Sequence, residues 1–445
     1  MVINMAKDIN TDEAMERREY RHKRRVRNQI ISYVTVAILL AGIAVGGYLG
    51  ASKAMTAMND KKHAQELKEQ LEELAEVEEE PAVVEAPVET EPPVEEKSYL
   101  DEIVDACIAE MPIEDKVAGL FIITPEALTG TDTAIKAGDA TKEMLNQHAV
   151  GGLIYFTKNI KSSEQLTEML QNTRSWSKYP IFLGIDEEGG TVSRVAEAGL
   201  AENVGDMGTI GTSGDASLAS SAGATIGSYL AGFGFDLDFA PVADVIIEGN
   251  EIIGNRSFGT DTNMVADMVG AYVDGLQSTG VNACIKHFPG LGDTVEDTHG
   301  GMATSEKTLE DFTAIDFPVY QKGIEVGANF VMASHLSVPN VVGDNTPTSL
   351  SEKMITEILR GQLGYQGIVV TDAMNMTAIT DYYTADEAAI KALQAGADMI
   401  LMPEDFETAY NGVLEAVNNG TLSEERINES LQRIYRVKYK DKVTE

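Results

Sequence analysis

Histidine, cysteine and basic side chains are all scarce in this sequence. Among 445 residues there are six histidines and two cysteines, and 34 lysines and arginines stand against 71 aspartates and glutamates, a net charge of −37. Cys107 and Cys284 each lie in an apolar run, which favours buried free thiols over a disulfide or a metal site. So acidic a chain should repel nucleic acid and anionic membrane surfaces, and it suits a neutral ligand.

The first part of the chain differs from the acidic remainder. Residues 17–27 are rich in arginine and lysine, and residues 28–52 carry no charge. A membrane-spanning helix needs roughly 20 mostly apolar residues, and Ile30–Leu49 supplies them. Because a basic cluster precedes this span, the amino terminus is predicted to stay in the cytoplasm and the rest of the chain to lie outside.

Four segments are therefore expected: a basic cytoplasmic tail at 1–29, a transmembrane anchor at 30–51, a stalk at 52–97 and a catalytic domain at 98–445. The stalk combines a short helical pattern with a Glu/Pro-rich spacer that cannot bury enough apolar surface to fold. The expected location is the cell membrane of a Gram-positive-type surface, with a single pass and an extracellular catalytic domain. A cleaved, secreted form is the alternative, because "ASKA" at 51–54 loosely resembles a signal-peptide cleavage site.

Eight short apolar runs alternate with helix-like stretches in the catalytic domain. Continuous apolar strands separated by helices are typical of a parallel sheet covered on both faces. Eight such units fit a (β/α)8 barrel of the TIM type, which takes about 250 residues plus insertions. An open doubly wound sheet is the alternative, but no Gly-rich phosphate loop follows the first run. The runs lie at 118–124, 150–156, 180–186, 235–244, 282–288, 328–334, 367–373 and 397–403.

Polar side chains stand at the carboxyl ends of five of these runs. They are Asp186, Asp244, Lys286 with His287, Ser334 with His335, and Asp372. One run ending in Asp or Ser means little, but five such runs form a pattern. In a barrel the carboxyl ends of the strands form the active-site face. The sequence therefore predicts a site at that end of the barrel.

Three chemistries can use such a set of carboxylates, imidazoles and cations. Metal-dependent hydrolysis needs closely spaced ligands, but the chain has no H-x-H or H-E-x-x-H, and Lys286 beside His287 would repel a metal ion. Phosphoryl transfer favours a basic Gly-rich cradle, which so acidic a body does not provide. Glycoside hydrolysis needs a carboxylate nucleophile facing a proton donor and fits best. No metal and no cofactor is expected.

Six segments resemble glycoside hydrolase family 3, in particular its single-barrel β-N-acetylglucosaminidase (β-N-acetylhexosaminidase) branch. They are "IDEEGGTVSRV" (185–195), "GFDLDFAPVADV" (234–245), "GNRSFGTD" (254–261), "KHFPGLGDTVEDTH" (286–299), "VTDAMNM" (370–376) and "ALQAGADMILMP" (392–403). The resemblance implies an exo-glycosidase that removes terminal β-linked N-acetylglucosamine. Many members carry a second α/β domain after the barrel, whereas a single, monomeric catalytic domain is expected here.

The resemblance also implies a role for each matching position. Asp372 of "TDAMNM" would be the nucleophile, and His299 would be the acid/base, paired with Asp297 two residues earlier. Sugar contacts are implied for Asp186, Arg194, Arg256, Lys286 and His287. The expected outcome is retention of anomeric configuration through a covalent glycosyl-Asp372 intermediate.

The sequence departs from the family pattern at Leu291, Thr298, Thr191 and Glu187. Thr191 and Glu187 lie near Asp186 in the sequence, so the fine substrate preference stays open. The expected substrate is a GlcNAc-containing glycan, derived from peptidoglycan fragments. Two alternatives stay open: a β-glucosidase or β-xylosidase of the same family, and a non-catalytic surface glycan-binding protein.

Overall fold

Eight parallel strands form the centre of the structure, a computed structural model that describes residues 98–247, 249–294 and 301–440. The strands are β1 (Phe121–Ile123), β2 (Gly152–Tyr155), β3 (Phe182–Ile185), β6 (Leu237–Asp238), β7 (Asn282–Phe288), β8 (Phe330–Ala333), β9 (Ile368–Thr371) and β10 (Ile400–Leu401). Hydrogen-bonded neighbours follow the order β10-β1-β2-β3-β6-β7-β8-β9. The order closes on itself because Val370 of β9 pairs in parallel with Met399. The predicted eight-stranded α/β barrel is confirmed.

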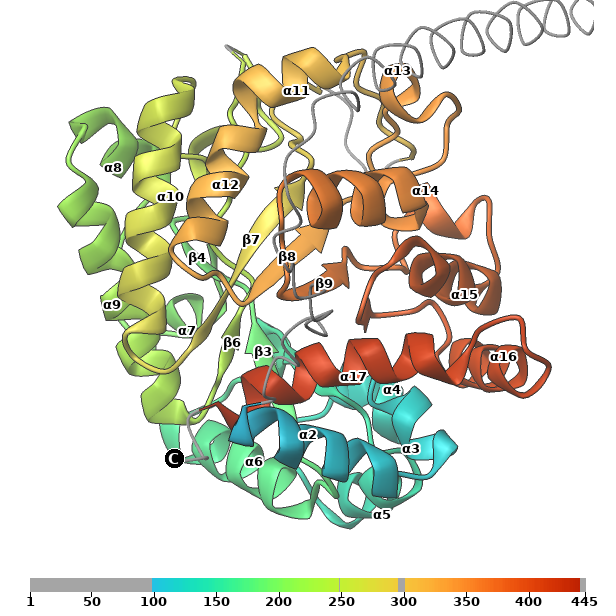
Figure 1. Ribbon diagram of the computed structural model, residues 1–445. Coiled ribbons are helices and arrows are strands. Elements are labelled where there is room, and N and C mark those ends of the chain that lie inside the picture. Colours follow the sequence, from blue (N-terminus) through green and yellow to red (C-terminus); the bar gives the residue numbers. More distant parts are fainter. Residues whose placement is uncertain (1–97, 248, 295–300, 441–445) are drawn as a thin grey trace, which may run out of the picture. The chain divides into compact units, whose positions relative to one another are not determined.

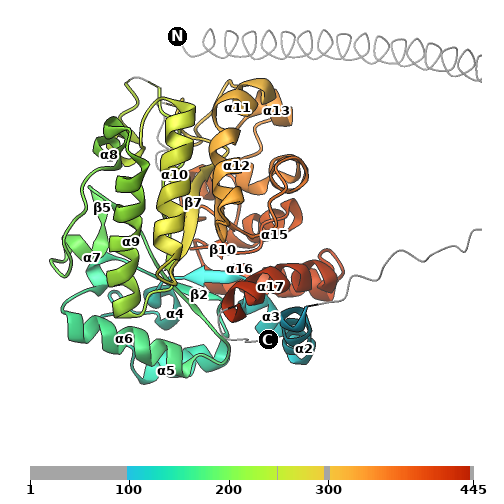
Figure 2. The ribbon, with the colours of Figure 1, turned by 60° about the vertical axis from the view of Figure 1, so that its left-hand side comes forward.

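Helices cover the outside of this barrel (Figures 1 and 2). The longer ones are α2 (Tyr99–Glu110), α5 (Asp139–Gln147), α6 (Ser163–Trp176), α9 (Ala216–Phe233), α10 (Thr262–Gln277), α12 (Phe317–Glu325), π-helical η4 (Lys353–Gln362), α15 (Ala385–Ala395), α16 (Phe406–Asn418) and α17 (Glu424–Tyr439). The shorter ones are α3 (Ile113–Ala118), α4 (Pro125–Thr129), α7 (Arg194–Glu197), α8 (Met207–Ser213), α11 (Leu309–Ile315), α13 (Pro339–Val342), α14 (Thr377–Thr380), η1 (Thr157–Asn159), η2 (Gly254–Arg256) and η3 (Thr348–Leu350). Both views show α9, α10 and α12 side by side along one flank.

Local sequence signals explain where several of these elements begin and end. The side chains of Asp215 and Ser423 accept hydrogen bonds from backbone N–H groups at the starts of α9 and α17, which satisfies donors that the first helical turn leaves free. Gly234 and Gly396 end α9 and α15 at φ of 107° and 109°, a conformation that favours glycine. The barrel strands are buried along their whole length, as continuous apolar runs require.

A buried carboxylate holds the seam where the barrel closes. Asp398, which directly precedes Met399, accepts hydrogen bonds from the backbone N–H of Val369 at 2.9 Å and from the Ser430 hydroxyl of α17 at 2.8 Å. Its oxygens also pair with the guanidinium groups of Arg360 at 2.5 Å and Arg433 at 3.0 Å. Because a charge inside a protein must be paired, this network ties β9, η4 and α17 together, away from the cavity described below.

The predicted tail, anchor and stalk lie outside the described residues. Within the described ranges, no helix is long and apolar enough to cross a membrane. Cys107 and Cys284 are free thiols, as predicted, with Cys284 buried and Cys107 half-buried. A two-stranded hairpin, β4 (Glu187–Gly189) with β5 (Val192–Ser193), follows β3 and was not expected from the sequence.

Candidate active site

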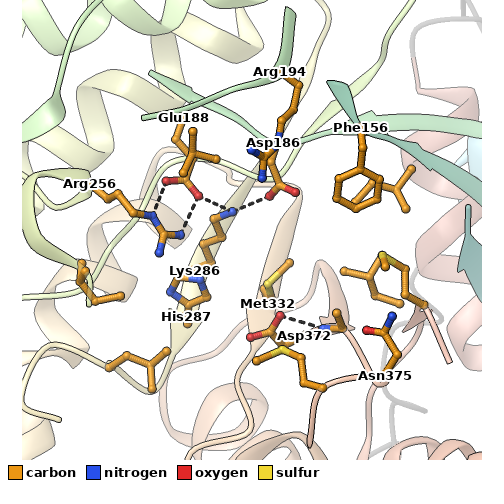
Figure 3. A pocket seen from close by; sticks show the side chains of 18 of the residues that line it. Phe156, Asp186, Glu188, Arg194, Arg256, Lys286, His287, Met332, Asp372 and Asn375 are labelled. Atoms are coloured by element: carbon orange, nitrogen blue, oxygen red, sulfur yellow. Dashed lines mark hydrogen bonds and ion pairs between the residues drawn. The ribbon is translucent and has the colours of Figure 1, made fainter. Parts of the chain in front are cut away.

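A cavity of about 400 Å³ opens at the carboxyl ends of the strands (Figure 3). Asp186 follows β3, Lys286 and His287 belong to the end of β7, and Asp372 follows β9. The apolar part of the wall comes from Ile154, Phe156, Val192, Ile252, Ile253, Leu291, Met332, Met376, Leu401 and Met402. A cavity with apolar walls and a few convergent polar groups is the usual form of a small-molecule site.

Six of the eight residues to which the sequence assigned a catalytic or sugar-binding role line this cavity. They are Asp186, Arg194, Arg256, Lys286, His287 and Asp372. The other two, Asp297 and His299, lie outside the described residues. The six come from segments up to 186 residues apart, and the barrel brings them together because parallel strands end at the same face.

The Lys286 ammonium group lies between two carboxylates. Its Nζ atom is 2.7 Å from Oδ1 of Asp186 and 2.7 Å from Oε1 of Glu188. Burial alone would lower the pKa of Lys286, but the charges of these two carboxylates raise it above its ordinary value. Lys286 is therefore a fixed cation, and it orients the Asp186 carboxylate at the cavity wall.

Glu188 is a site residue that the sequence reasoning missed. It is buried, and its carboxylate binds Arg256 through two hydrogen bonds, Nε–Oε2 at 2.7 Å and Nη2–Oε1 at 2.8 Å. Burial alone would raise the pKa of Glu188, but the adjacent Lys286 and Arg256 cations lower it to about 2. Figure 3 shows the resulting chain from Arg256 through Glu188 and Lys286 to Asp186. The sequence did contain a signal for Glu188: it is a second carboxylate close to Asp186, and a buried carboxylate requires a cationic partner.

The neighbouring Glu187 points the other way. Its carboxylate accepts hydrogen bonds from the backbone N–H groups of Val195 at 2.7 Å and Ala196 at 3.1 Å, and from the Tyr229 hydroxyl at 2.9 Å. Successive side chains of a strand face opposite sides, so Glu187 holds the start of α7 while Glu188 faces the cavity. Thr191 is exposed in the hairpin turn. Neither Glu187 nor Thr191 lines the cavity, whereas Leu291 does line it.

Asp372 presents an ionised carboxylate to the cavity. Its backbone N–H donates to the carbonyl of Ala333 on β8 at 2.8 Å, and its Oδ1 accepts from the N–H of Ala373 at 2.7 Å. Burial alone would raise the pKa of Asp372, but electrostatic interactions with His335, His287 and Lys286 and the Ala373 hydrogen bond lower it below its ordinary value. The carboxylate is therefore ionised at neutral pH.

The imidazole of His287 is held by a second buried carboxylate. Its Nδ1 lies 2.8 Å from Oδ2 of Asp244, and Oδ1 of Asp244 accepts from the N–H of Leu291 at 2.7 Å. The partner of one ring nitrogen fixes the orientation of the other, so Asp244 sets how His287 meets the cavity. Lys286 and His287 both line it although they are consecutive, and the peptide bond between them is cis.

Arg194 contributes a second cation to the wall of the cavity. Its Nε atom is buried and makes no hydrogen bond within the described part of the chain. Buried polar atoms are normally hydrogen-bonded, so this donor is suited to a hydroxyl or carbonyl oxygen of a ligand. His335, by contrast, is fully buried behind Asp372, with Nδ1 2.8 Å from the Ser349 hydroxyl and Nε2 3.0 Å from the Ala373 carbonyl.

These features suit a barrel enzyme that acts on a neutral, hydroxyl-rich ligand. The cavity offers one ionised carboxylate, Asp372, opposite a carboxylate–cation network, and such groups suit the acid/base and hydrogen-bonding demands of glycoside hydrolysis. Among the described residues no cluster of three or more His, Cys, Asp or Glu side chains is arranged to hold a metal ion.

The chain belongs to glycoside hydrolase family 3. Residues 112–437 match the family description "Glycosyl hydrolase family 3 N terminal domain". The chain is 34% identical over 279 residues to a β-hexosaminidase of Stenotrophomonas maltophilia, covering 61% of this chain and 82% of that protein. It is 31% identical over 328 residues to β-hexosaminidase A of Pseudoalteromonas piscicida, covering 67% of this chain and 54% of that one. The resemblance to the β-hexosaminidase branch that the motifs indicated is thereby confirmed.

Comparison with a solved structure supports the same family assignment. The fold matches a family 3 β-N-acetylglucosaminidase from Paenibacillus sp. with a TM-score of 0.69 and 33% identity, covering 75% of this chain and 64% of that one. The chain therefore spans about half to two thirds of the length of some of the proteins it resembles.

Proposed function

We propose that this chain is a retaining exo-glycosidase that hydrolyses terminal β-linked N-acetylglucosamine. The observation that carries the proposal is the ionised Asp372 carboxylate in the same cavity as Asp186, Arg194, Arg256, Lys286 and His287. Relatives and neighbours named β-hexosaminidase and β-N-acetylglucosaminidase support the choice of sugar. A cavity of about 400 Å³ is of the size that small ligands use.

The reaction takes two steps. First, the Asp372 carboxylate attacks the anomeric carbon, the glycosidic C–O bond breaks, and the leaving oxygen takes a proton from His299. Then His299 takes a proton from water, the water oxygen attacks the same carbon, and Asp372 is released. Asp297 stabilises the imidazolium form of His299, which is present before the first step and restored by the second. Two inversions at one carbon give net retention.

The cavity's polar wall holds the sugar during both steps. The Asp186 carboxylate, fixed by Lys286, accepts hydrogen bonds from vicinal hydroxyls. Arg194 donates from another part of the wall, which His287 also lines, and Arg256 is held against the wall by Glu188. Because these groups are fixed before the substrate binds, little reorganisation is needed in the transition state.

Purified full-length protein in mild detergent, assayed on a panel of 4-nitrophenyl β-glycosides, tests the proposed activity. Release from the N-acetylglucosaminide, at a kcat/KM at least about tenfold above that for the glucoside and xyloside, is the expected result, a difference that pocket contacts commonly produce. Turnover of only the glucoside or the xyloside would assign the other family activity. Binding of N-acetylglucosamine without any turnover would favour the glycan-binding alternative.

The location belongs to the same proposal. Residues 30–51 anchor the chain with the barrel outside the cell, where glycans from peptidoglycan are within reach; the uncharged span after a basic cluster supports this. Protease added to intact cells is expected to degrade the barrel while a cytoplasmic marker survives. A barrel that becomes sensitive only after the cells are lysed would contradict this topology.

A further inference from the structure

A second pocket, of about 490 Å³, adjoins the cavity that holds Asp372. Phe156, Arg194 and Met402 line both spaces, so the two share a boundary. Figure 3 shows Phe156 across the main cavity from Arg256. We name the second space the outer pocket; its other lining residues are Thr124, Thr157, Lys158 and Glu197.

The outer pocket begins beside the proposed nucleophile. The loop that follows Asp372 is bonded to β10, because the N–H of Met374 donates to the carbonyl of Leu401 at 2.9 Å. Met402, which lines both spaces, is the next residue after Leu401. From there the pocket extends over the carboxyl ends of β1 and β2. A group that leaves the carbon attacked by Asp372 therefore has the outer pocket next to it.

The backbone of Met402 is strained at this boundary. Its φ is 46°, and no other residue except glycine has a positive φ within 98–247, 249–294 and 301–440. This left-handed conformation is uncommon for a residue with a long side chain. Residues held in such a conformation cluster at active sites and ligand clamps. The strain at Met402 thus points to a contact with a ligand where the two spaces meet.

A buried asparagine organises the polar side of the outer pocket. Oδ1 of Asn159 accepts from the N–H of Phe156 at 2.8 Å, and Nδ2 of Asn159 donates to Oε1 of Glu126 at 2.6 Å. Oε2 of Glu126 makes no hydrogen bond in the described part of the chain and lies 3.6 Å from Nζ of Lys158. The half-exposed Lys158 ammonium is therefore held by charge, and its N–H groups can donate to a ligand.

An acceptor group lies in the same pocket as this donor. Oε2 of the exposed Glu197 accepts from the Thr157 hydroxyl at 2.7 Å, and a carboxylate can accept further hydrogen bonds. A sugar hydroxyl both donates and accepts, and a pyranose ring has apolar C–H faces. A cation, a carboxylate and the apolar side chains of Phe156 and Met402 together suit such a ring.

The two spaces differ in the exposure of their polar groups. Lys286 and His287 of the main cavity are buried, whereas Lys158 and Glu197 of the outer pocket are exposed. An exo-glycosidase encloses the terminal sugar and leaves the rest of the glycan toward solvent. The main cavity therefore suits the terminal sugar, and the outer pocket suits the sugar that follows it.

We propose that the outer pocket binds the sugar ring on the leaving-group side of the scissile bond, with Lys158 and Glu197 as its specificity-determining residues. The inference rests on the proposed function, since it names the kind of leaving group, a second pyranose, that the same site takes. Binding energy from a part of the substrate away from the reacting carbon can be used in the transition state. The subsite is therefore expected to act on kcat/KM for glycans.

Two N-acetyl-β-glucosaminides that differ in the leaving group test this inference in the full-length protein. One is the β-linked disaccharide of N-acetylglucosamine, and the other is the methyl glycoside, which has no second ring. Lys158→Met is expected to lower kcat/KM for the disaccharide about tenfold, the scale of one lost hydrogen bond to a charged group, and kcat/KM for the methyl glycoside less than about twofold. Glu197→Ala is expected to shift the two substrates in the same way. Release of N-acetylglucosamine measures both reactions.

Lys161→Met is the matched control, because Lys161 is an exposed lysine three positions further along the chain and lines neither space. Equal losses on both substrates in Lys158→Met and Glu197→Ala, or no loss on either, would overturn the inference while leaving the proposed function intact. A wild-type protein that cleaves neither substrate would contradict the proposed function itself. If Lys158→Met does not fold because Glu126 loses its counter-charge, Glu197→Ala changes an exposed side chain and gives the same comparison.

Discussion

Replacing Asp372 with alanine is expected to lower kcat on N-acetyl-β-glucosaminides by at least about 10⁴-fold, the scale found when an enzyme loses its nucleophile. In the proposed mechanism an oxygen of this carboxylate forms the covalent bond to the sugar, and the lowered pKa keeps the carboxylate ionised. Asp372 accepts a single hydrogen bond, from Ala373, among those the structure describes, so the free energy of unfolding should change little. Kinetics with a chromogenic N-acetylglucosaminide and urea unfolding measure the two effects.

Asp381→Ala provides the control for this prediction. Asp381 is exposed at the end of α14, nine positions further along the chain, and does not line the cavity. It should keep wild-type kcat and KM. If Asp372→Ala keeps more than about one hundredth of the wild-type kcat, far more than loss of a nucleophile allows, another residue carries the reaction.

Replacing Glu188 with glutamine is the second large expected effect. The substitution keeps the shape of the side chain but leaves Lys286 and Arg256 without their shared counter-charge, and breaking a buried pair in this way costs about 3–5 kcal/mol. Activity should fall by about 10²-fold, because small misplacements of substrate-positioning groups have effects of that size. Urea unfolding and kcat/KM at pH 7 measure both quantities.

The pH dependence of this stability difference has a defined sign. The pKa of Glu188 is about 2 in the folded protein, below the ordinary value of 4.5, so the stabilisation is fully present above pH 4.5 and is lost as the pH falls through about 2. The shift corresponds to about 3 kcal/mol at 1.36 kcal/mol per pKa unit. More than half of the difference between wild type and Glu188→Gln should therefore be gone at about pH 3.

Glu187→Gln is the matched control, since it makes the same change one residue away. Burial raises the pKa of Glu187, so its contribution to stability is present at low pH and lost as the pH rises. The stability difference between wild type and Glu187→Gln should thus change with pH in the opposite direction. A Glu188→Gln variant with wild-type stability and activity at pH 7 would show that the network through Lys286 does not organise the cavity.

The barrel was predictable because its strands are buried on both faces. Such strands appear as uninterrupted apolar runs, and each of the eight observed strands lies inside a predicted run. The convergence of Asp186, Lys286 and Asp372 was predictable for the same reason, since each follows or ends a parallel strand. Their roles came from the resemblance to a family, and they remain predictions.

The hairpin after β3 was not predictable in the same way. Whether Glu187 or Glu188 faces the cavity depends on the register of β4 against β5, and a shift of one residue would exchange the two faces. Glu187 and Thr191 both follow Asp186 closely in the sequence, yet neither lines the cavity. The structure places one against α7 and the other at the surface.

The pairing of Lys307 with Asp293 and Asp316 was not predictable from the sequence for a different reason. Asp293, Lys307 and Asp316 are separated by up to 23 positions and follow no strand or helix periodicity that marks them as a group. Only the packing of α11 and α12 beside the end of β7 brings their charges together. Sequence patterns report the burial of apolar faces well, but they say little about which polar side chains meet across loops.

Mass spectrometry of the protein trapped with a 5-fluoro N-acetylglucosaminyl fluoride tests the central claim most directly. The fluorine atom destabilises the positively charged transition states, and the good leaving group still allows the covalent intermediate to form. One sugar should attach to the protein, and digestion should place it on the peptide that contains Asp372. Steady turnover of substrate with the sugar on a different residue would contradict Asp372 as the nucleophile.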